Sequence, residues 1–425
     1  MEPMITKQGS GYLIEWPSLK LEVIAKQLHP SGYKAFCGFM LNGEPIHRSN
    51  PTLNSNSGMT SLARLLNKRR PKDDWGIDWD QIVEDLAGIL IDTVGEGKAD
   101  VVLGEVEVEE GSQWRIDNLL LEKQHNLIWA DGGTGKSMFA LFLSVMVQLG
   151  YVNTEHNLMV EPGKVLYLDW ETDSIEIAKR SRMVHKGLGV ENPFSHIRYK
   201  QMSGGLGSNI DKVQDIVYDH DIDMVVIDSL GMAVDGQLED AGSVIQFFSH
   251  LSSLNTTTLV VSHSNRNGQI FGSAYTVNQS RNVWEAKKSA SDTGGLDFSL
   301  FHRKSNNVGM QPAQSWSMDF KDGAVGYTRG DTFHTDNAGS LSYSLLVYRT
   351  LQEEGPKNRE YLKDKLKAMK ADPPDRIERN VDVAVSKHKA SGKIDEGEDG
   401  ILSLATLAFN PPGETSEKGD SWQSL

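Results

Sequence analysis

A glycine-rich loop between two apolar segments constrains this chain more than any other feature. Residues 126–129 are an apolar run expected to form a strand, residues 130–137 read Ala-Asp-Gly-Gly-Thr-Gly-Lys-Ser, and residues 138–148 are an apolar stretch expected to form a helix. Strand, loop and helix in this order are the context of a phosphate-binding P-loop. Its backbone N–H groups and the helix N-terminus favour phosphate oxygens, and a lysine supplies a cation. The residues predicted to bind a nucleotide are Gly132, Gly133, Thr134, Gly135, Lys136 and Ser137.

A metal ion beside such phosphates needs oxygen ligands. The hydroxyl of Ser137 is one, and Asp228, which ends the apolar run 224–227, is predicted to be the second. Together they predict ATP and Mg²⁺ as ligands. Two other interpretations stay open: the loop is only a turn before a buried helix, or Asp228 caps a helix. Ala130 stands where the motif usually has glycine, which is a mild departure.

Composition limits the class of protein. The chain has 425 residues, 38% hydrophobic and 24% charged, which is typical of a folded protein of two or three domains. Its net charge of −15 means that any contact with nucleic acid must be local. Cys37 is the single cysteine, so no internal disulfide and no recognisable zinc site are expected. The longest apolar run, 138–152, is too short to span a bilayer, and the start does not resemble a secretory signal, so we expect a cytoplasmic protein.

The hydrophobic pattern changes along the chain and predicts three folded parts. Residues 1–105 mix β-rich runs, an Asn42-Gly43 hairpin signal and two helical stretches, which indicates a small α+β domain. Residues 106–330 alternate short apolar strands with helices, which predicts an α/β domain with a mostly parallel sheet. Residues 340–408 have the helix and strand order of a winged-helix-like domain, and the polar tail 409–425 is expected to be disordered.

The central part resembles a known family. Over about residues 114–305, its P-loop and strand ends are similar to those of the RecA/DnaB-type ATPases, and within them the plasmid RepA-like hexameric helicases. The resemblance implies a RecA-like core in which Glu171, after the strand 165–168, activates the attacking water. Asp169 competes for that role. It also implies that His263, at the end of the strand 258–262, senses the γ-phosphate, although a lone histidine is often only a surface residue.

The resemblance also implies where DNA and a neighbouring subunit would bind. Of the two axial loops, 231–242 contains acids and 264–275 does not, so Arg266 and Asn267 in the second are predicted to contact DNA phosphates. A cation from the next subunit is expected near the end of a late strand. Lys304 is the first candidate for it, and the other candidates are Arg303 and Arg281.

These expectations combine into an ATP-hydrolysing motor. We expect the subunits to assemble into a hexameric ring that moves on single-stranded DNA as a phage- or plasmid-type replicative helicase. The flanking domains are expected to bind replication proteins. A nucleotide-switched loader or regulator without unwinding activity is the main alternative, and a small-molecule kinase is a second one. The winged-helix-like part could dock DNA or protein, and the basic cluster 68–72 could contact DNA or only solvate a linker.

Overall fold

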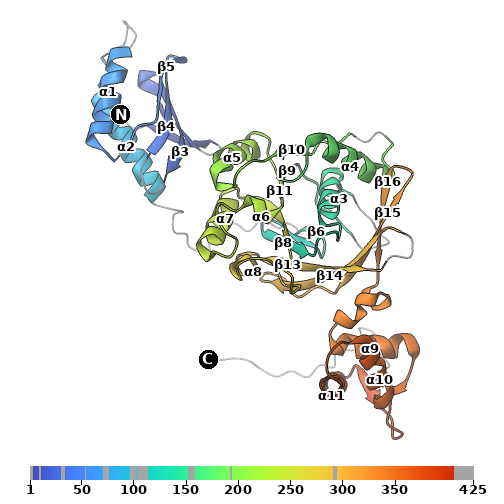
Figure 1. Cartoon of the computed structure of the whole chain (residues 1–425). Helices are drawn as coiled ribbons and strands as arrows, with labels where there is room; N and C mark the ends of the chain where they lie inside the picture. Colours follow the sequence, from blue (N-terminus) through green and yellow to red (C-terminus); the bar gives the residue numbers. More distant parts are fainter. Residues whose placement is uncertain are drawn as a thin grey trace, which may run out of the picture. The chain divides into compact units, whose positions relative to one another are not determined.

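The computed structural model describes residues 3–8, 11–29, 34–52, 54–69, 76–95, 103, 113–151, 158–191, 194–290 and 294–405. The chain forms two compact units, Met1–Gly330 and Asp331–Leu425 (Figure 1). The expected boundary at 105/106, the tail 409–425 and residues 70–72 of the basic cluster lie outside the described residues.

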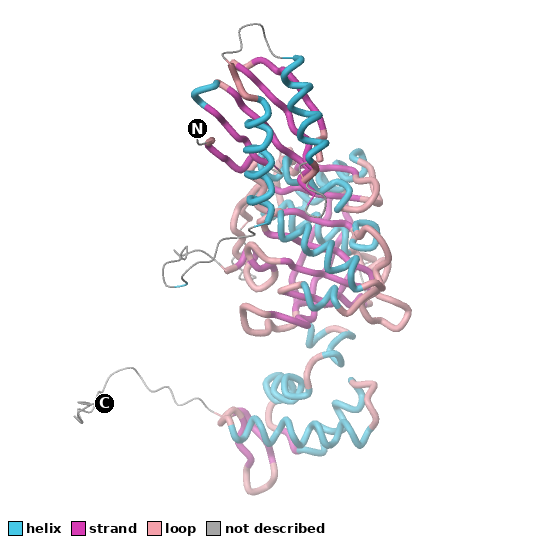
Figure 2. Tube along the Cα trace, turned by 90° about the vertical axis from the view of Figure 1, so that its left-hand side faces the viewer, coloured by secondary structure: helices cyan, strands magenta, loops and turns pink. Residues whose placement is uncertain are grey.

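The N-terminal part is a five-stranded antiparallel sheet in the order β1-β2-β3-β4-β5, with two helices on one face (Figure 2). Alternate strand residues such as Val23 and Phe39 are buried against Leu66 and Leu86 of the helices. Asn42 and Gly43 have φ of 53° and 79° and join β4 to β5, which confirms the hairpin. The elements are β1 (Met4–Gln8), β2 (Gly11–Trp16), β3 (Leu21–His29), β4 (Lys34–Leu41), β5 (Glu44–Ser49), α1 (Asn56–Arg69) and α2 (Trp79–Gly95).

A nine-stranded sheet forms the centre of the first unit, in the order β10-β9-β11-β12-β8-β13-β14-β15-β16. The strands from β10 to β13 are parallel, and β14, β15 and β16 join antiparallel. The predicted mostly parallel α/β core is therefore confirmed. The strands are β8 (His125–Ala130), β9 (Val165–Asp169), β10 (Arg198–Gln201), β11 (Met224–Asp228), β12 (Thr257–His263), β13 (Asn282–Ser289), β14 (Leu296–Ser305), β15 (Gln314–Lys321) and β16 (Ala324–Gly330), beside a small pair, β6 (Trp114–Ile116) and β7 (Leu120–Leu121).

Helices cover both faces of this sheet, so its central strands β8, β9, β11 and β12 are buried on two sides. On one face Phe139 of α3 packs with Tyr167 and Val226, and on the other Phe247 of α7 packs with Ile227 and other strand residues. This arrangement brings the carboxyl ends of β8, β9, β11 and β12 to one edge. The helices are α3 (Lys136–Leu149), α4 (Ser174–Gly187), α5 (Ile210–Asp219), α6 (Leu230–Ala233), α7 (Ala241–Ser253) and α8 (Tyr275–Gln279).

The second unit has the element order of a winged helix, as expected. Three helices bury Leu346, Leu362 and Val381, and a three-stranded sheet has the order β17-β19-β18. Its elements are α9 (Tyr343–Glu354), β17 (Lys357–Asn358), α10 (Arg359–Met369), α11 (Pro374–Ala390), β18 (Ile394–Glu396) and β19 (Ile401–Leu404). Across the described part of the chain, no helix is long and apolar enough to span a membrane.

Candidate nucleotide-binding site

The P-loop follows β8 and begins α3, as the sequence predicts. Gly133 and Gly135 have φ of 71° and 87°, a conformation that side chains rarely adopt. A Cβ on Gly135 would also lie 2.3 Å from the Cε of Met318. Thr134 is buried, and its hydroxyl donates to the carbonyl of Asp131 at 2.7 Å, which fixes the loop internally. The loop therefore requires glycine for both conformation and space.

Lys136 is the first residue of α3 and is only 7% exposed. Its Nζ donates to the carbonyl oxygens of Ala130 and Asp131 at 2.9 and 2.7 Å. Burial lowers the pKa of Lys136, although the carboxylates of Asp228, Asp131 and Glu171 partly oppose this shift. A phosphate would provide the desolvated ammonium group with a full negative charge in place of carbonyl oxygens.

Ser137 and Asp228 meet, as the predicted metal ligands must. Ser137 Oγ donates to Asp228 Oδ1 at 3.2 Å, and the hydroxyl of Tyr167 on β9 donates to Oδ2 at 2.6 Å. Burial raises the pKa of Asp228 to about 6, although these two hydrogen bonds lower it. One hydroxyl and one carboxylate suit Mg²⁺, which is commonly held by one or two protein oxygens together with phosphates and water. Among the described residues, no group of three or more His, Cys, Asp or Glu side chains could hold a metal ion.

The two acids after β9 have different environments. Asp169 is buried, and its Oδ1 accepts hydrogen bonds from the backbone N–H groups of Glu171 and Thr172 at 2.8 and 3.1 Å, so it builds the turn. The side chain of Glu171 is 50% exposed and lines the pocket beside the P-loop. Its Oε1 accepts a hydrogen bond from Ser229 Oγ at 2.9 Å. The geometry therefore favours Glu171 over Asp169 as the group that contacts water.

His263 lies between the lysine and the glutamate. Its Nδ1 is 3.5 Å from Lys136 Nζ, and its Nε2 is 3.9 Å from Glu171 Oε1. Burial and the charge of Lys136 lower the pKa of His263, while Glu171 opposes the shift, so the imidazole is neutral near pH 7. A neutral imidazole can donate one hydrogen bond to a phosphate oxygen. Lys136, Ser137, Glu171, Asp228 and His263 therefore share one site.

The pocket that Lys136, Ser137, Glu171 and His263 line also contains side chains that the sequence did not identify. It encloses about 460 Å³, and Glu176, Arg180 and Met183 of α4 and Phe320 of β15 complete its wall. Arg180 Nε donates to Glu176 Oε1 at 3.0 Å. No local motif marks these residues, since α4 and β15 reach the pocket only through the fold. Tyr167 and Ser229 lie within the strand-end segments, yet nothing in the sequence assigns them a partner.

Arg266 and Asn267 lie on a tight turn that begins directly after His263. Asn265 N donates to Gln269 O at 2.6 Å, and Asn265 Oδ1 accepts the N–H groups of Asn267 and Gln269 at 2.9 and 3.1 Å. The side chains of Arg266 and Asn267 are outside the nucleotide pocket. In the other loop, Asp240 caps α7 and Asp235 accepts from Gly207 N, so these acids have local structural partners.

The three candidate cations at the opposite edge of the sheet differ in their contacts. Lys304 Nζ donates to the carbonyl oxygens of Val277, Asn278 and Ser280 at 2.9, 2.8 and 2.7 Å, at the end of α8. Arg303 pairs with Glu285, whereas the side chain of Arg281 is exposed and has no ion pair with any described residue. The predicted role of Lys304 stays a prediction, and it would require release of these carbonyls.

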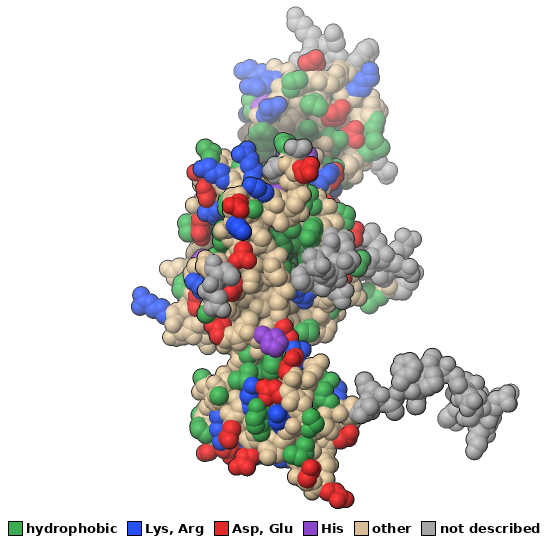
Figure 3. All heavy atoms as spheres, turned by 90° about the vertical axis from the view of Figure 1, so that its right-hand side faces the viewer, with side chains coloured by type: hydrophobic (Ala, Val, Ile, Leu, Met, Phe, Trp, Pro, Cys, Tyr) green, Lys and Arg blue, Asp and Glu red, His purple; other side chains and the backbone are tan. Residues whose placement is uncertain are grey.

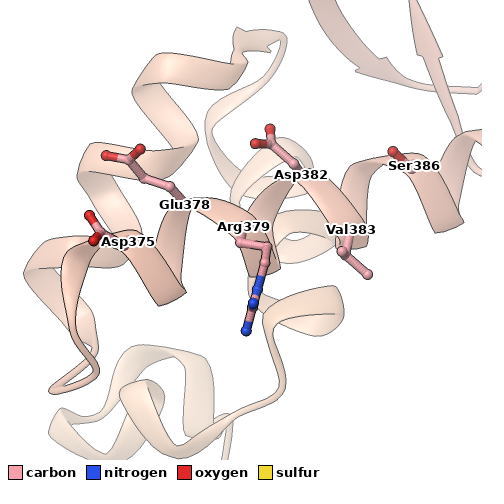
Figure 4. Close-up of a pocket in the computed structure, with 6 residues that line it drawn as sticks. All are labelled: Asp375, Glu378, Arg379, Asp382, Val383 and Ser386. Atoms are coloured by element: carbon pink, nitrogen blue, oxygen red, sulfur yellow. The ribbon is translucent and has the colours of Figure 1, made fainter.

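The winged-helix unit carries charges of both signs. A shallow hollow on α11 is lined by Asp375, Glu378, Arg379, Asp382, Val383 and Ser386, and Arg379 and Val383 point away from the three carboxylates (Figure 4). Glu378 pairs with Lys367, and Asp382 pairs with Lys363. Acidic and basic side chains are likewise interspersed on the face of this unit in Figure 3. Neither this hollow nor the face in Figure 3 is a uniformly basic surface of the kind that phosphate binding uses.

Comparison with known proteins agrees with the site. Residues 100–269 match a family described as AAA domain. No curated protein matches the chain. Among solved structures, a KaiC-like protein from the hyperthermophilic archaeon Pyrococcus horikoshii is 12% identical, covers 50% of this chain and 93% of its own, and has a TM-score of 0.36. A TM-score this low supports no argument. Lys136, Ser137, Glu171 and Asp228 all lie within the residues that are similar to the AAA domain family, and their arrangement is that of a P-loop nucleotide-binding site.

Proposed function

We propose that this protein is an ATP-driven motor that forms a ring and moves on single-stranded DNA, as a replicative helicase of the phage or plasmid type does. One observation carries the proposal: His263 connects the nucleotide site to the turn that contains Arg266. Its ring lies 3.5 Å from Lys136 Nζ and 3.9 Å from Glu171 Oε1, and the turn begins directly after it in the chain. A change at the γ-phosphate would therefore move the base of an exposed, cationic turn. Such a connection is what a motor needs between hydrolysis and DNA.

The chemistry of the turn fits single-stranded DNA. Residues 264–275 contain no aspartate or glutamate, although the chain as a whole has a net charge of −15. Arg266 and Asn267 can contact phosphates, and the side chains of Phe271 and Tyr275 are 40% and 42% exposed. Stacking of a base on an aromatic side chain contributes about 1–3 kcal/mol and tolerates any sequence. Phosphate contacts and stacking together suit movement along a strand without sequence preference.

The residues of the site have separable roles in hydrolysis. Ser137 and Asp228 would hold Mg²⁺, which would neutralise charge on the phosphates. Lys136 stabilises negative charge on the γ-phosphoryl oxygens as the bond to the leaving group breaks. Glu171 orients the attacking water and accepts its proton, and His263 donates a hydrogen bond to the γ-phosphate. Negative charge on the transferred group still calls for a further cation.

We assign that cation to a neighbouring subunit and propose Arg281 before Lys304. The Arg281 side chain has no competing ion pair with the described residues, whereas Lys304 holds the end of α8. Mixing tests the assignment. Glu171→Gln rings have intact cations, and Arg281→Ala rings have intact water-activating sites, so mixed rings should recover part of the hydrolysis that both lack. Full activity in a strictly monomeric preparation would contradict a shared site, and Lys304→Ala in the same mixture would identify the alternative cation.

DNA binding is tested by fluorescence anisotropy of labelled single strands with the full-length protein. Arg266→Ala should weaken binding and make its salt dependence shallower, because one phosphate contact is lost. Arg198→Ala is a matched control, since Arg198 is an exposed arginine on strand β10 outside the turn. Unchanged affinity and salt slope for Arg266→Ala would exclude this turn. Strand displacement by the wild type supports a helicase, and binding without displacement would favour the nucleotide-switched loader.

A further inference from the structure

Two neighbouring strands exchange side-chain hydrogen bonds at the catalytic edge. In the β9–β11 ladder, Tyr167 lies opposite Val226 and Asp169 lies opposite Asp228. The hydroxyl of Tyr167, from β9, donates to Asp228 Oδ2 at 2.6 Å. In the opposite direction, Ser229 Oγ, directly after β11, donates to Glu171 Oε1 at 2.9 Å. Tyr167 of β9 thus donates to the carboxylate that ends β11, and Ser229, after β11, donates to the carboxylate that follows β9.

The side chains of Tyr167 and Ser229 are buried, whereas the Glu171 side chain that Ser229 contacts is half exposed. Tyr167 is fully buried between the sheet and α3, and Ser229 is 2% exposed at the start of α6. The Glu171 side chain is 50% exposed, so solvent and rotamer freedom compete with its functional position. Asp228 is buried, yet its carboxylate can still rotate about its terminal bond. Without fixed donors, neither carboxylate would have a defined orientation toward the pocket.

We propose that Tyr167 and Ser229 are positioning residues with different tasks: Tyr167 turns Asp228 Oδ1 toward Ser137 and the metal position, and Ser229 holds Glu171 over the γ-phosphate position. This inference rests on the proposed ATPase site and adds two residues to it. Tyr167 occupies Oδ2, so only Oδ1 is left to face Ser137 Oγ at 3.2 Å. Ser229 contacts Glu171 and not Asp228, so the two effects are separable.

The test for Tyr167 is a Mg²⁺ titration. Binding of an ATP analogue with a non-hydrolysable β–γ bridge is measured at increasing Mg²⁺ in wild type and Tyr167→Phe. The half-saturating Mg²⁺ concentration should rise roughly 10-fold or more, as is typical when a residue that orients a metal ligand is lost. Binding of the analogue in EDTA should not change, and hydrolysis at saturating Mg²⁺ should stay near wild type. An unchanged Mg²⁺ requirement would overturn the assignment of Tyr167.

The test for Ser229 is a double-mutant cycle. Ser229→Ala should lower kcat roughly 10-fold while leaving analogue binding and the Mg²⁺ requirement unchanged, and Ser229→Thr, which keeps the hydroxyl, should recover much of the loss. In a Glu171→Gln background, Ser229→Ala should have no further effect, because its partner no longer acts. An equal loss in both backgrounds would mean a general structural role and would overturn the proposal.

The two variants also serve as controls for each other. Both remove one buried hydroxyl from the same pair of strands, so a nonspecific disturbance of this edge would change Mg²⁺ dependence and kcat together. The inference is supported if Tyr167→Phe changes only the Mg²⁺ requirement and Ser229→Ala changes only kcat. It is contradicted if each variant changes both quantities. If the wild type binds the analogue but does not hydrolyse ATP, the proposed function fails, and the Mg²⁺ titration of Tyr167→Phe still decides whether Tyr167 orients Asp228.

Discussion

Replacement of Asp228 by asparagine should stabilise the protein while it abolishes function. Burial raises the pKa of Asp228 from 3.8 to about 6. A rise of about two pKa units corresponds to about 3 kcal/mol, because each unit is worth about 1.4 kcal/mol. Near neutral pH the buried Asp228 carboxylate is ionised and therefore destabilises the metal-free folded protein by about this amount. The substituted asparagine side chain would be neutral and could still accept the hydrogen bond from Tyr167 through its carbonyl oxygen.

The sign of the effect depends on pH. The folded pKa lies above the unfolded value, so the penalty appears as pH rises from about 4 to about 6 and is absent below that range. In EDTA at pH 7, the variant should be more stable by about 2–3 kcal/mol, which raises the unfolding temperature of a domain of this size by roughly 5–10 °C. About half of the gain should remain at pH 5, where wild-type Asp228 is mostly protonated in the fold.

Thermal unfolding at both pH values measures this effect, with Asp169→Asn as the matched control. Asp169 ends the neighbouring strand and is also buried, but its Oδ1 accepts two backbone N–H groups, so its replacement should bring no gain. If Asp228→Asn is no more stable than wild type at pH 7, the charge of Asp228 is not costly. A gain of equal size at pH 5 and pH 7 would also refute the electrostatic explanation.

The other predictions concern the two lysines and the glutamate. Lys136→Ala should abolish ATP hydrolysis, because it removes charge compensation at the phosphates, and it should also lower the unfolding temperature, because a buried side chain and its hydrogen bonds to the carbonyls of Ala130 and Asp131 are lost; near-normal turnover would remove Lys136 from its role. Glu171→Gln should bind ATP with wild-type affinity in an equilibrium assay and hydrolyse it very slowly. Lys304→Ala and Lys304→Met should both weaken α8 by about 1 kcal/mol, since the side chain is partly exposed, and hydrogen exchange of residues 275–280 should become faster. Exchange at the wild-type rate in both would show that these contacts add nothing.

The sequence predicts the part of the site that local patterns encode. The P-loop requires glycine at particular positions, and the strands before Glu171 and Asp228 are almost uniformly apolar because helices cover both faces of the sheet. Since parallel strands align their carboxyl ends, the acids and His263 had to meet at one edge. The meeting of Lys136, Glu171 and His263 follows from this topology.

Features that depend on contacts between distant segments were not predictable. Strand β13 carries Glu285 in its interior, which breaks the apolar pattern, and this carboxylate is tolerated because Arg303 of β14 pairs with it. The contacts of Lys304 with the end of α8 depend on the antiparallel return of β14. Phe320 reaches the pocket only because β15 extends the sheet beyond β14. No spacing along the chain encodes any of these contacts.

The central claim is that ATP hydrolysis and single-stranded DNA are coupled through the turn that follows His263. The most direct test is the steady-state rate of ATP hydrolysis by the full-length protein, with Mg²⁺, over increasing concentrations of single-stranded DNA. The account predicts a low basal rate that rises and saturates with DNA, and it predicts that Arg266→Ala needs more DNA for the same rate while its basal turnover is unchanged. A wild-type protein that hydrolyses ATP at one rate whatever the DNA concentration would contradict the account.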